Sequence, residues 1–339
     1  MTRADQAKRF IAASSWADAT LRPLAGDASN RRYDRLTKTN GKSAVLMDAP
    51  PDKGEDVRPF VQIARYLSAR GLSAPDIYAQ DPDNGFSLIE DLGDRLFARE
   101  MLSSPDSEDM LYEAAVDVLI HLHGAPAPNL PAYRSALTVP LAALAYDWYQ
   151  KGAGGAPDAN AQQTFSAAFE RIIQPYDAAL TVLIQRDYHA ENLLWLPDRS
   201  GHARVGLLDF QDAMLGHPSY DLVSVLQDAR RDVAEETQTK MLARYIERTG
   251  QDSDGFTAAY AVFGLQRNLR ILGVFARLCL RDGKAHYVDL IPRVWGHVQA
   301  NLQHPALAEV KPIIADTLTP PSPDILKKLK GDCGTWTGQ

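Results

Sequence analysis

The sequence predicts an α+β protein with a β-rich part up to about residue 93 and a mainly helical part after it. Before Gly93, short strand-like runs are separated by turn signals, and one helical pattern lies between them. After Gly93, apolar residues recur mostly at helical spacing. At roughly 150 residues per domain, a chain of 339 residues suits two domains. We therefore expect one lobe over 1–93, a second lobe over 94–318 and a C-terminal tail over 319–339.

The β-rich part is expected to contain two hairpins. Asn40 and Gly41 separate strand-like runs over 33–37 and 43–47, and an Asn-Gly pair in that place favours a hairpin turn. A second hairpin is expected across the turn at 81–85, and its second strand runs toward Gly93. Between the hairpins, five apolar residues at helical spacing predict one helix, which Gly71 ends as a C-cap. These residues are Val57, Phe60, Val61, Ala64 and Leu67.

The part after Gly93 is expected to be helical except for one small hairpin, made by the apolar runs 193–196 and 205–208. The segment 151–159, rich in glycine and alanine, is typical of a loop. The residues from Thr319 onward begin Thr-Pro-Pro-Ser-Pro and are expected to form a surface arm. The expected helices cover 108–123, 138–150, 160–174, 218–231, 234–249, 256–281 and 286–302.

Composition limits the classes of protein to consider. Hydrophobic residues make up 45% and charged residues 23%, which excludes a largely disordered or fibrous chain. The formal net charge of −7 makes nucleic acid a poor partner. No apolar run approaches the roughly 20 residues that span a bilayer, and the N-terminus shows no apolar signal-peptide core. Cys279 and Cys333 form no CxxC motif, which excludes a zinc finger and favours a reducing compartment. We therefore expect a cytoplasmic protein that binds neither nucleic acid nor membranes.

The residues most indicative of chemistry follow the pattern Arg-Asp-x-x-x-x-Asn, then an apolar hairpin, then Asp-Phe. Phosphoryl transfer from ATP needs a positioned acceptor hydroxyl and divalent cations that neutralise the phosphates. Asp187 has the place of a base for the hydroxyl, and Asn192 and Asp209 offer the oxygen ligands that Mg²⁺ prefers. The alternative, three ordinary loop residues, is disfavoured because the pattern falls between a helix and a hairpin.

With these motifs the chain resembles, from about Leu21 to about Ala300, the kinase-like superfamily and within it the aminoglycoside phosphotransferase family of small-molecule kinases. The narrower likeness is to the bacterial anomeric sugar kinases of cell-wall recycling, which act on N-acetylmuramate and N-acetylglucosamine. The resemblance implies a bilobal protein-kinase-like fold, ATP and Mg²⁺ as cofactors, and a small sugar as substrate. The stretches that carry the narrower likeness are 26–33 (GDASNRRY), 46–51 (LMDAPP), 186–189 (RDYH), 209–213 (DFQDA) and 220–224 (YDLVS).

The resemblance also implies a nucleotide site. The turn at 26–33 would cover the phosphates, because a glycine-bearing turn lets backbone N–H groups approach them closely. The alternative is a hairpin turn with solvated arginines. The strand that ends near residue 90 would place backbone groups against adenine. The nucleotide-binding residues expected on this basis are Gly26, Ser29, Arg31, Arg32, Glu90 and Leu92.

An acceptor site is implied in the helical lobe. His189 would contact the substrate, or else cap the catalytic turn. Trp148 and Tyr149 would offer aromatic faces to a sugar, although aromatic residues on a helix are more often part of a core. Asp221 is expected in the first turn of a helix, where a carboxylate suits the helix dipole, and the resemblance implies that it braces the catalytic loop.

Two departures from the family pattern keep alternatives open. Kinases of this superfamily usually carry a Lys on the third strand, but here the strand 44–48 ends at Asp48, so Arg31 or Arg32 would have to neutralise the phosphates. Gln185 stands where the family often has His. The alternatives are the same chemistry on an aminoglycoside, choline or another metabolite hydroxyl, and a nucleotide-binding pseudokinase that acts through partners.

Overall fold

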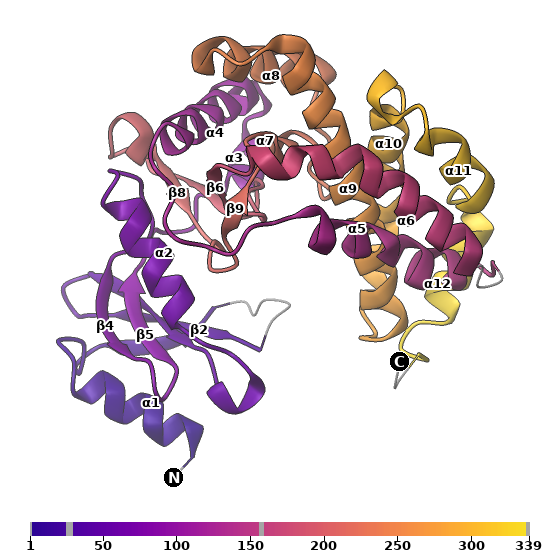
Figure 1. Ribbon diagram of the computed structural model, residues 1–339. Helices are drawn as coiled ribbons and strands as arrows, with labels where there is room; N and C mark the ends of the chain where they lie inside the picture. The colour runs from indigo at the N-terminus through magenta and orange to yellow at the C-terminus, as the bar shows by residue number, and fades with distance from the viewer. Residues whose placement is uncertain (1, 25–29, 156–158, 337–339) are drawn as a thin grey trace. The chain divides into compact units, whose positions relative to one another are not determined.

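The computed structural model describes residues 2–24, 30–155 and 159–336, and these divide into two compact units. The first unit comprises Met1–Leu122 and Ala190–Ala213, and the second comprises His123–His189 and Met214–Gln339. Figure 1 colours the chain from the N-terminus to the C-terminus. Neither unit is a single stretch of chain, because residues 190–213 return to the first unit. The expected lobe boundary at residues 93 and 94 stays a prediction.

The first unit contains a five-stranded antiparallel sheet in the order β1-β2-β3-β5-β4. Both expected hairpins are confirmed, and Gly41 takes the φ of +82° that the first turn requires. The central strands β3 and β5 supply buried residues such as Leu46 and Leu88. The strands are β1 Thr20–Pro23, β2 Arg32–Thr37, β3 Ser43–Asp48, β4 Ile77–Asp81 and β5 Phe86–Glu90.

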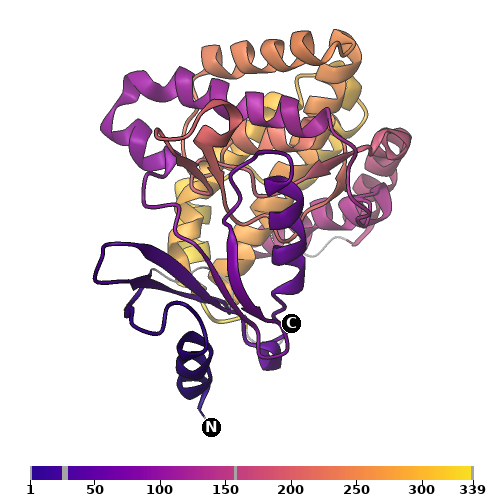
Figure 2. The same ribbon diagram turned by 90° about the vertical axis from the view of Figure 1, so that its left-hand side faces the viewer.

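Helices flank this sheet, and one of them was not expected. The helix α1 (Arg3–Ala12) begins at a capping box of Thr2 and Asp5, and its Ile11 joins the core of the sheet. Figure 2 shows α1, next to the N label, beside the strands of this unit. The expected helix is α2 (Arg58–Ser68), and further helices of this unit are α3 (Phe97–Ser103) and α4 (Glu108–His123), whose last residue belongs to the second unit. The sequence prediction of a single helix in this part was therefore wrong, because α1 is short and mostly polar.

The small hairpin of β7 (Leu193–Trp195) and β8 (Val205–Leu207) is confirmed, and it is attached to the first unit. Ser73 forms an isolated bridge to Gly206, and Leu96 forms one to Leu194. Short 3₁₀ turns complete the unit: Pro51–Lys53, Pro105–Ser107 and Gly201–Arg204.

The second unit is helical, and its core surrounds the 28-residue helix α9 (Ser253–Leu280). A two-stranded sheet of β6 (Val182–Ile184) and β9 (Met214–Gly216), which the sequence did not predict, also belongs to it. The helix expected over 218–231 ends at residue 226, and the one expected over 286–302 starts as the 3₁₀ turn Ala285–Leu290. The other elements are α5 Ser135–Leu144, the π-helical segment Ala145–Gln150, α6 Ala159–Ile173, the 3₁₀ turn Gln174–Ala179, α7 Ser219–Leu226, α8 Glu235–Thr249, α10 Ile291–Asn301, the 3₁₀ turn Pro305–Leu307, α11 Val310–Thr317 and α12 Pro323–Gly331.

The expected surface arm after Thr319 is corrected by the structure. Ser322 caps the helix α12 by accepting from the Ile325 N–H, and Leu329 on this helix is fully buried in the core of the second unit. The Cys279 Sγ donates to the Leu329 carbonyl at 3.3 Å. The proline-rich start of the segment concealed this helix, because a proline in the first turn starts a helix as readily as it ends one. Within the described ranges no helix is both long and apolar enough to cross a membrane.

Candidate active site

Asn192 and Asp209 lie together in the first unit. The Asn192 Nδ2 donates to Asp209 Oδ2 at 3.4 Å, and the Gln211 Nε2 donates to Asp209 Oδ1 at 2.6 Å. The Leu208 N–H donates to the Asn192 carbonyl at 3.0 Å. Asp209 has a φ of +57°, a left-handed conformation that is uncommon outside glycine. The buried Phe210 stacks on Phe60 of α2 at 4.9 Å between ring centroids, and so anchors the backbone that holds this conformation.

The donor set of this pair suits Mg²⁺. It offers one carboxylate and one amide oxygen, and Mg²⁺ keeps several waters when it is held by one or two protein oxygens. Where the chain is described, no group of three or more His, Cys, Asp or Glu residues could hold a metal ion. The assignment of Asn192 and Asp209 as metal ligands stays a prediction.

Asp187 belongs to the second unit, since the chain passes from the second unit to the first between His189 and Ala190. It follows β6 and comes directly after Arg186, whose φ is +73°. Asp221 in the first turn of α7 holds this backbone: its Oδ2 accepts from the Gln185 N–H at 2.6 Å and its Oδ1 from the Arg186 N–H at 3.0 Å. The Ser224 Oγ donates to the Arg186 carbonyl at 3.2 Å. Helix α7 thus fixes the turn that presents Asp187.

The charges around Asp187 keep it ionised. Burial raises the pKa of its carboxyl group, but nearby positive charge, at neutral pH that of Arg270, Arg267 and Arg186, outweighs burial and lowers the pKa. A carboxylate with a lowered pKa is ionised at neutral pH and can accept a hydrogen bond from a hydroxyl group. This is the protonation state that the expected role of base requires.

Two neighbours of Asp187 are more deeply buried. Burial raises the pKa of Asp221 to about 7, against the opposing effect of its two backbone N–H donors. His189 is 4% exposed, and burial lowers its pKa to about 4, so the imidazole is neutral at pH 7. The Arg230 Nη1 donates to His189 Nε2 at 3.2 Å. The ring therefore accepts from a protein group, and its expected contact with substrate stays a prediction.

Tyr149 and Trp148 were expected to offer aromatic faces to a sugar, and the structure corrects this for Tyr149. Tyr149 is fully buried in the core of the second unit, and its hydroxyl donates to the Thr319 carbonyl at 2.7 Å. Trp148 is partly buried against the same core, with its ring centroid 6.0 Å from that of Trp336. The segment 145–150 is π-helical and directs Tyr149 inward, which favours the core interpretation that the sequence left open.

The expected phosphate-binding residues are partly accounted for. Gly26 and Ser29 lie outside the described residues. The Arg31 side chain is 12% exposed and its Nε lies 2.9 Å from Glu55 Oε2. The Arg32 side chain is 65% exposed and its Nη2 lies 3.0 Å from Asp48 Oδ2. Of these two cations, Arg32 is the better placed to meet a ligand because most of its side chain faces solvent.

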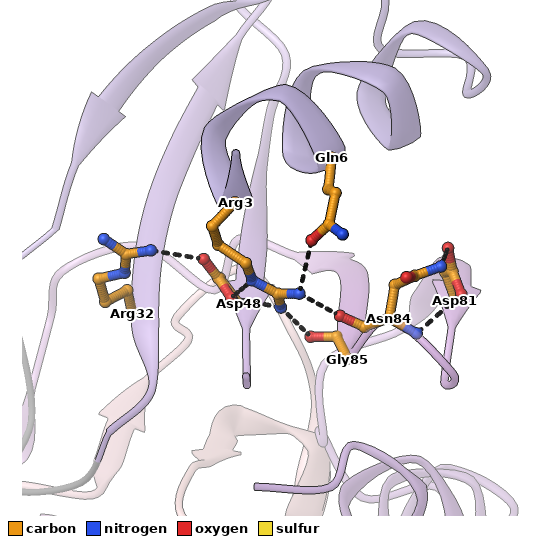
Figure 3. Close-up of polar contacts among 7 residues, drawn as sticks. All are labelled: Arg3, Gln6, Arg32, Asp48, Asp81, Asn84 and Gly85. Atoms are coloured by element: carbon orange, nitrogen blue, oxygen red, sulfur yellow. Dashed lines mark hydrogen bonds and ion pairs between the residues drawn. The ribbon is translucent and has the colours of Figure 1, made fainter. Parts of the chain in front are cut away.

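The end of β3, where the family usually has a Lys, carries a buried carboxylate between two arginines. The Arg3 Nη2 lies 2.6 Å from Asp48 Oδ1, while Arg32 contacts the other oxygen. Figure 3 shows that the Arg3 guanidinium also reaches the Asn84 carbonyl, to which its Nη1 donates at 2.6 Å. Positive charge is therefore placed beside the strand instead of on it. The sequence offered no sign of the Arg3 contact, because this residue precedes Asp48 by 45 positions.

The segment expected to meet adenine is held by ion pairs within the first unit. The Glu90 N–H donates to the Asp76 carbonyl at 2.8 Å, and the Glu90 side chain pairs with Arg199. Arg35 on β2 contacts Asp91 at 3.0 Å and Asp94 at 2.8 Å. The side chain and the backbone N–H of Glu90 are thus both engaged within the first unit. The nucleotide roles of Glu90 and Leu92 stay predictions.

Three arginines near Asp187 and His189 were not predicted from the sequence. They are Arg230, which follows α7, and Arg267 and Arg270, which lie on α9. A signal for Arg267 was present: the polar run Gln266-Arg267-Asn268 interrupts an otherwise apolar helix pattern. Such a run in the middle of a buried helix indicates buried polar contacts.

Comparison with known proteins gives consistent results. The model of the family described as "Phosphotransferase enzyme family" matches residues 20–261. The chain is 40% identical over 342 residues to the N-acetylmuramate/N-acetylglucosamine kinase of Caulobacter vibrioides, covering 89% of this chain and 93% of the relative. It is 33% identical to the kinase of the same name from Pseudomonas aeruginosa, covering 90% and 92%. The solved structure of choline kinase LicA from Streptococcus pneumoniae matches with a TM-score of 0.60 at 14% identity, covering 88% of this chain and 99% of that one. The α+β kinase-like fold and the family resemblance are thereby confirmed.

Proposed function

The chain belongs to the phosphotransferase enzyme family, and we propose that it transfers the γ-phosphoryl group of ATP to the anomeric hydroxyl of N-acetylmuramate and N-acetylglucosamine. The observation that carries the substrate is the 40% identity, over 89% of this chain, to a kinase named for these two sugars. Aminoglycoside or choline as acceptor is less favoured, because the solved choline, ethanolamine and aminoglycoside kinases that match this fold share only 11–18% identity with this chain.

In the proposed reaction, Asp187 accepts the proton of the C1 hydroxyl while that oxygen attacks the γ-phosphorus, and the bond to the ADP oxygen breaks. The products are the sugar 1-phosphate and ADP. An anomeric hydroxyl is more acidic than an ordinary alcohol, so a carboxylate with a lowered pKa is sufficient as base. Asp221 acts through the backbone, because it holds the N–H groups of Gln185 and Arg186 next to Asp187.

The nucleotide side of the proposal depends on the first unit. Asn192 and Asp209 would hold Mg²⁺, which when bound neutralises charge on the phosphates. Arg32 would take the part of the missing strand lysine, since its guanidinium is exposed and held by Asp48. We further propose the cytoplasm as the place of action, where ATP is available, and the recycling of cell-wall sugars as the process served.

The test is ³¹P NMR of the purified protein with Mg-ATP and, in separate samples, N-acetylmuramate, N-acetylglucosamine, kanamycin and choline. A sugar phosphate signal coupled to H1, absent with Asp187→Asn, is expected for the two sugars. The methyl glycoside of N-acetylglucosamine, whose C1 oxygen is blocked, is the matched substrate control and should give no product. Product with kanamycin or choline alone would show that the acceptor is that compound and neither of the two sugars. Bound but intact ATP in every sample would instead favour a pseudokinase.

A further inference from the structure

Arg267, in the middle of α9, is a buried cation with unused hydrogen-bonding capacity. It is 3% exposed, and among the described residues its Nε and Nη1 have no hydrogen-bond partner. Burying a charge without hydrogen bonds is unfavourable unless opposite charges lie nearby. An arginine in this state therefore needs an explanation beyond packing.

The neighbourhood of Arg267 supplies opposite charge but no direct partner for these two atoms within the described residues. Its charge acts on Asp187 and on Asp221. Both oxygens of Asp221 already accept backbone N–H groups. The guanidinium of Arg267 therefore interacts electrostatically with the proposed base Asp187, and its Nε and Nη1 can donate to a ligand.

Two other arginines of this region are already engaged. The Arg270 Nη1 donates to the Tyr220 hydroxyl at 3.5 Å, and the Arg230 Nη1 donates to His189 Nε2 at 3.2 Å. For Arg267, by contrast, Nε and Nη1 have no hydrogen-bond partner among the described residues.

The two proposed acceptor sugars differ by one charged group. N-acetylmuramate carries a lactyl ether that ends in a carboxylate, whereas N-acetylglucosamine has a hydroxyl in its place. The carboxylates of Asp187 and of the buried Asp228 both act on His189, and negative charge in this neighbourhood would repel the lactyl carboxylate unless a cation compensates. An arginine fork is suited to hold a carboxylate through two parallel N–H donors.

We propose that Arg267 binds the lactyl carboxylate of N-acetylmuramate and so lets the site accept the acidic sugar as well as the neutral one. This inference rests on the proposed function. It makes Arg267 a specificity-determining residue for the acceptor, and it leaves the chemical step to Asp187.

The experiment compares kcat and KM of the full-length protein for both sugars in the wild type, Arg267→Gln and Arg267→Lys. Loss of a hydrogen bond to a charged group predicts a fall in kcat/KM for N-acetylmuramate of about 10- to 100-fold, mainly through KM. Because Arg267 also lowers the pKa of Asp187, Arg267→Gln should reduce kcat equally for both sugars, while the KM for N-acetylglucosamine should stay unchanged. Arg267→Lys, which keeps the charge, should restore kcat for both sugars and part of the loss for N-acetylmuramate. Arg277→Gln, on the same helix and also with a buried Nε that lacks a partner among the described residues, is the matched control and should leave both sugars unaffected.

A second arm changes the substrate in place of the protein. The primary amide of N-acetylmuramate removes the negative charge, so the wild type should lose affinity for it, while Arg267→Gln should not distinguish the amide from the acid. Equal loss of kcat/KM for both sugars in the variants would overturn the proposal and make Arg267 a positioning residue for Asp187. This arm also remains informative if Arg267→Gln fails to fold, because Arg267→Lys and the wild type suffice.

Failure of the proposed function gives a different result. If the wild type phosphorylates neither sugar, calorimetric binding of N-acetylmuramate and its amide, without ATP, still tests Arg267. Weaker binding of the acid by Arg267→Lys than by the wild type would support the role of Arg267 even though the proposed function had failed. Binding that does not change between wild type and variant would overturn it.

Discussion

The two compact units hold their candidate residues in different ways. In the first unit, the Asn192 and Asp209 pair is fixed by backbone conformation and by neighbouring side-chain amides. In the second unit, Asp187 is surrounded by buried charges from helices that are distant in sequence, such as Arg267. It follows that changes in the first unit should appear as altered nucleotide affinity, whereas changes in the second should appear as altered turnover.

The largest expected effect is on turnover, from Asp187→Asn. Removal of a general base lowers kcat by about 10²- to 10⁴-fold, and the amide keeps the shape of the side chain. Mg-ATP affinity, measured by calorimetry, should stay the same because the proposed metal ligands lie in the first unit. The exposed Asp289→Asn in the second unit is the control for the loss of a carboxylate. Retained turnover would remove Asp187 from the mechanism.

The converse change is Asp209→Ala in the first unit. Loss of the carboxylate should weaken Mg-ATP binding by at least about 10-fold, or about 1.4 kcal/mol. Binding of N-acetylglucosamine without nucleotide should not change. A loss of Mg-ATP affinity with unchanged sugar affinity is the result that distinguishes the first unit from the second. Calorimetry of both ligands with one protein sample provides the comparison. Unchanged Mg-ATP affinity would contradict the metal role.

The stability of the second unit depends on its C-terminal helix. Leu329→Ala removes a fully buried side chain and should lower the free energy of unfolding by about 2–5 kcal/mol. The exposed Leu137→Ala in the same unit is the control and should cost far less. Urea denaturation measures both. A change for Leu329→Ala no larger than that for Leu137→Ala would show that α12 does not contribute to the core.

The smallest expected effect is a change in the pH dependence of stability. Burial lowers the pKa of His217 to about 4, below the value of about 6.5 that histidine has in an unfolded chain. A group with a lowered pKa stabilises the fold above its unfolded pKa, and this stability is lost as pH falls from about 6.5 toward about 4. His189 acts in the same direction, while Asp221, whose pKa burial raises to about 7, acts in the opposite one.

The test of this effect is the slope of unfolding free energy against pH between about 4.5 and 6. His217→Gln should reduce the slope by about 1.4 kcal/mol per pH unit, the contribution of one proton. The exposed His286→Gln controls for the loss of a histidine. Urea midpoints at three pH values give the slopes, and an unchanged slope in His217→Gln would mean that this ring is not buried in its neutral form.

Features that depend on local chemistry could be predicted from the sequence alone. Asn40 and Gly41 predicted a hairpin because that turn needs a residue free to adopt positive φ. The spacing of Asp187, Asn192 and Asp209 around a short apolar hairpin indicated phosphoryl transfer. These inferences needed only neighbours along the chain.

Contacts between distant residues depend on the tertiary structure. It places Arg3 on Asp48, buries Leu329 in the core and brings Arg267 near Asp187, although these last two are 80 positions apart. Patterning along a helix shows that a residue is polar, but it does not show which charge lies opposite. That depends on how α9 packs against the turn after β6, which is set by burial of apolar surface across the whole second unit.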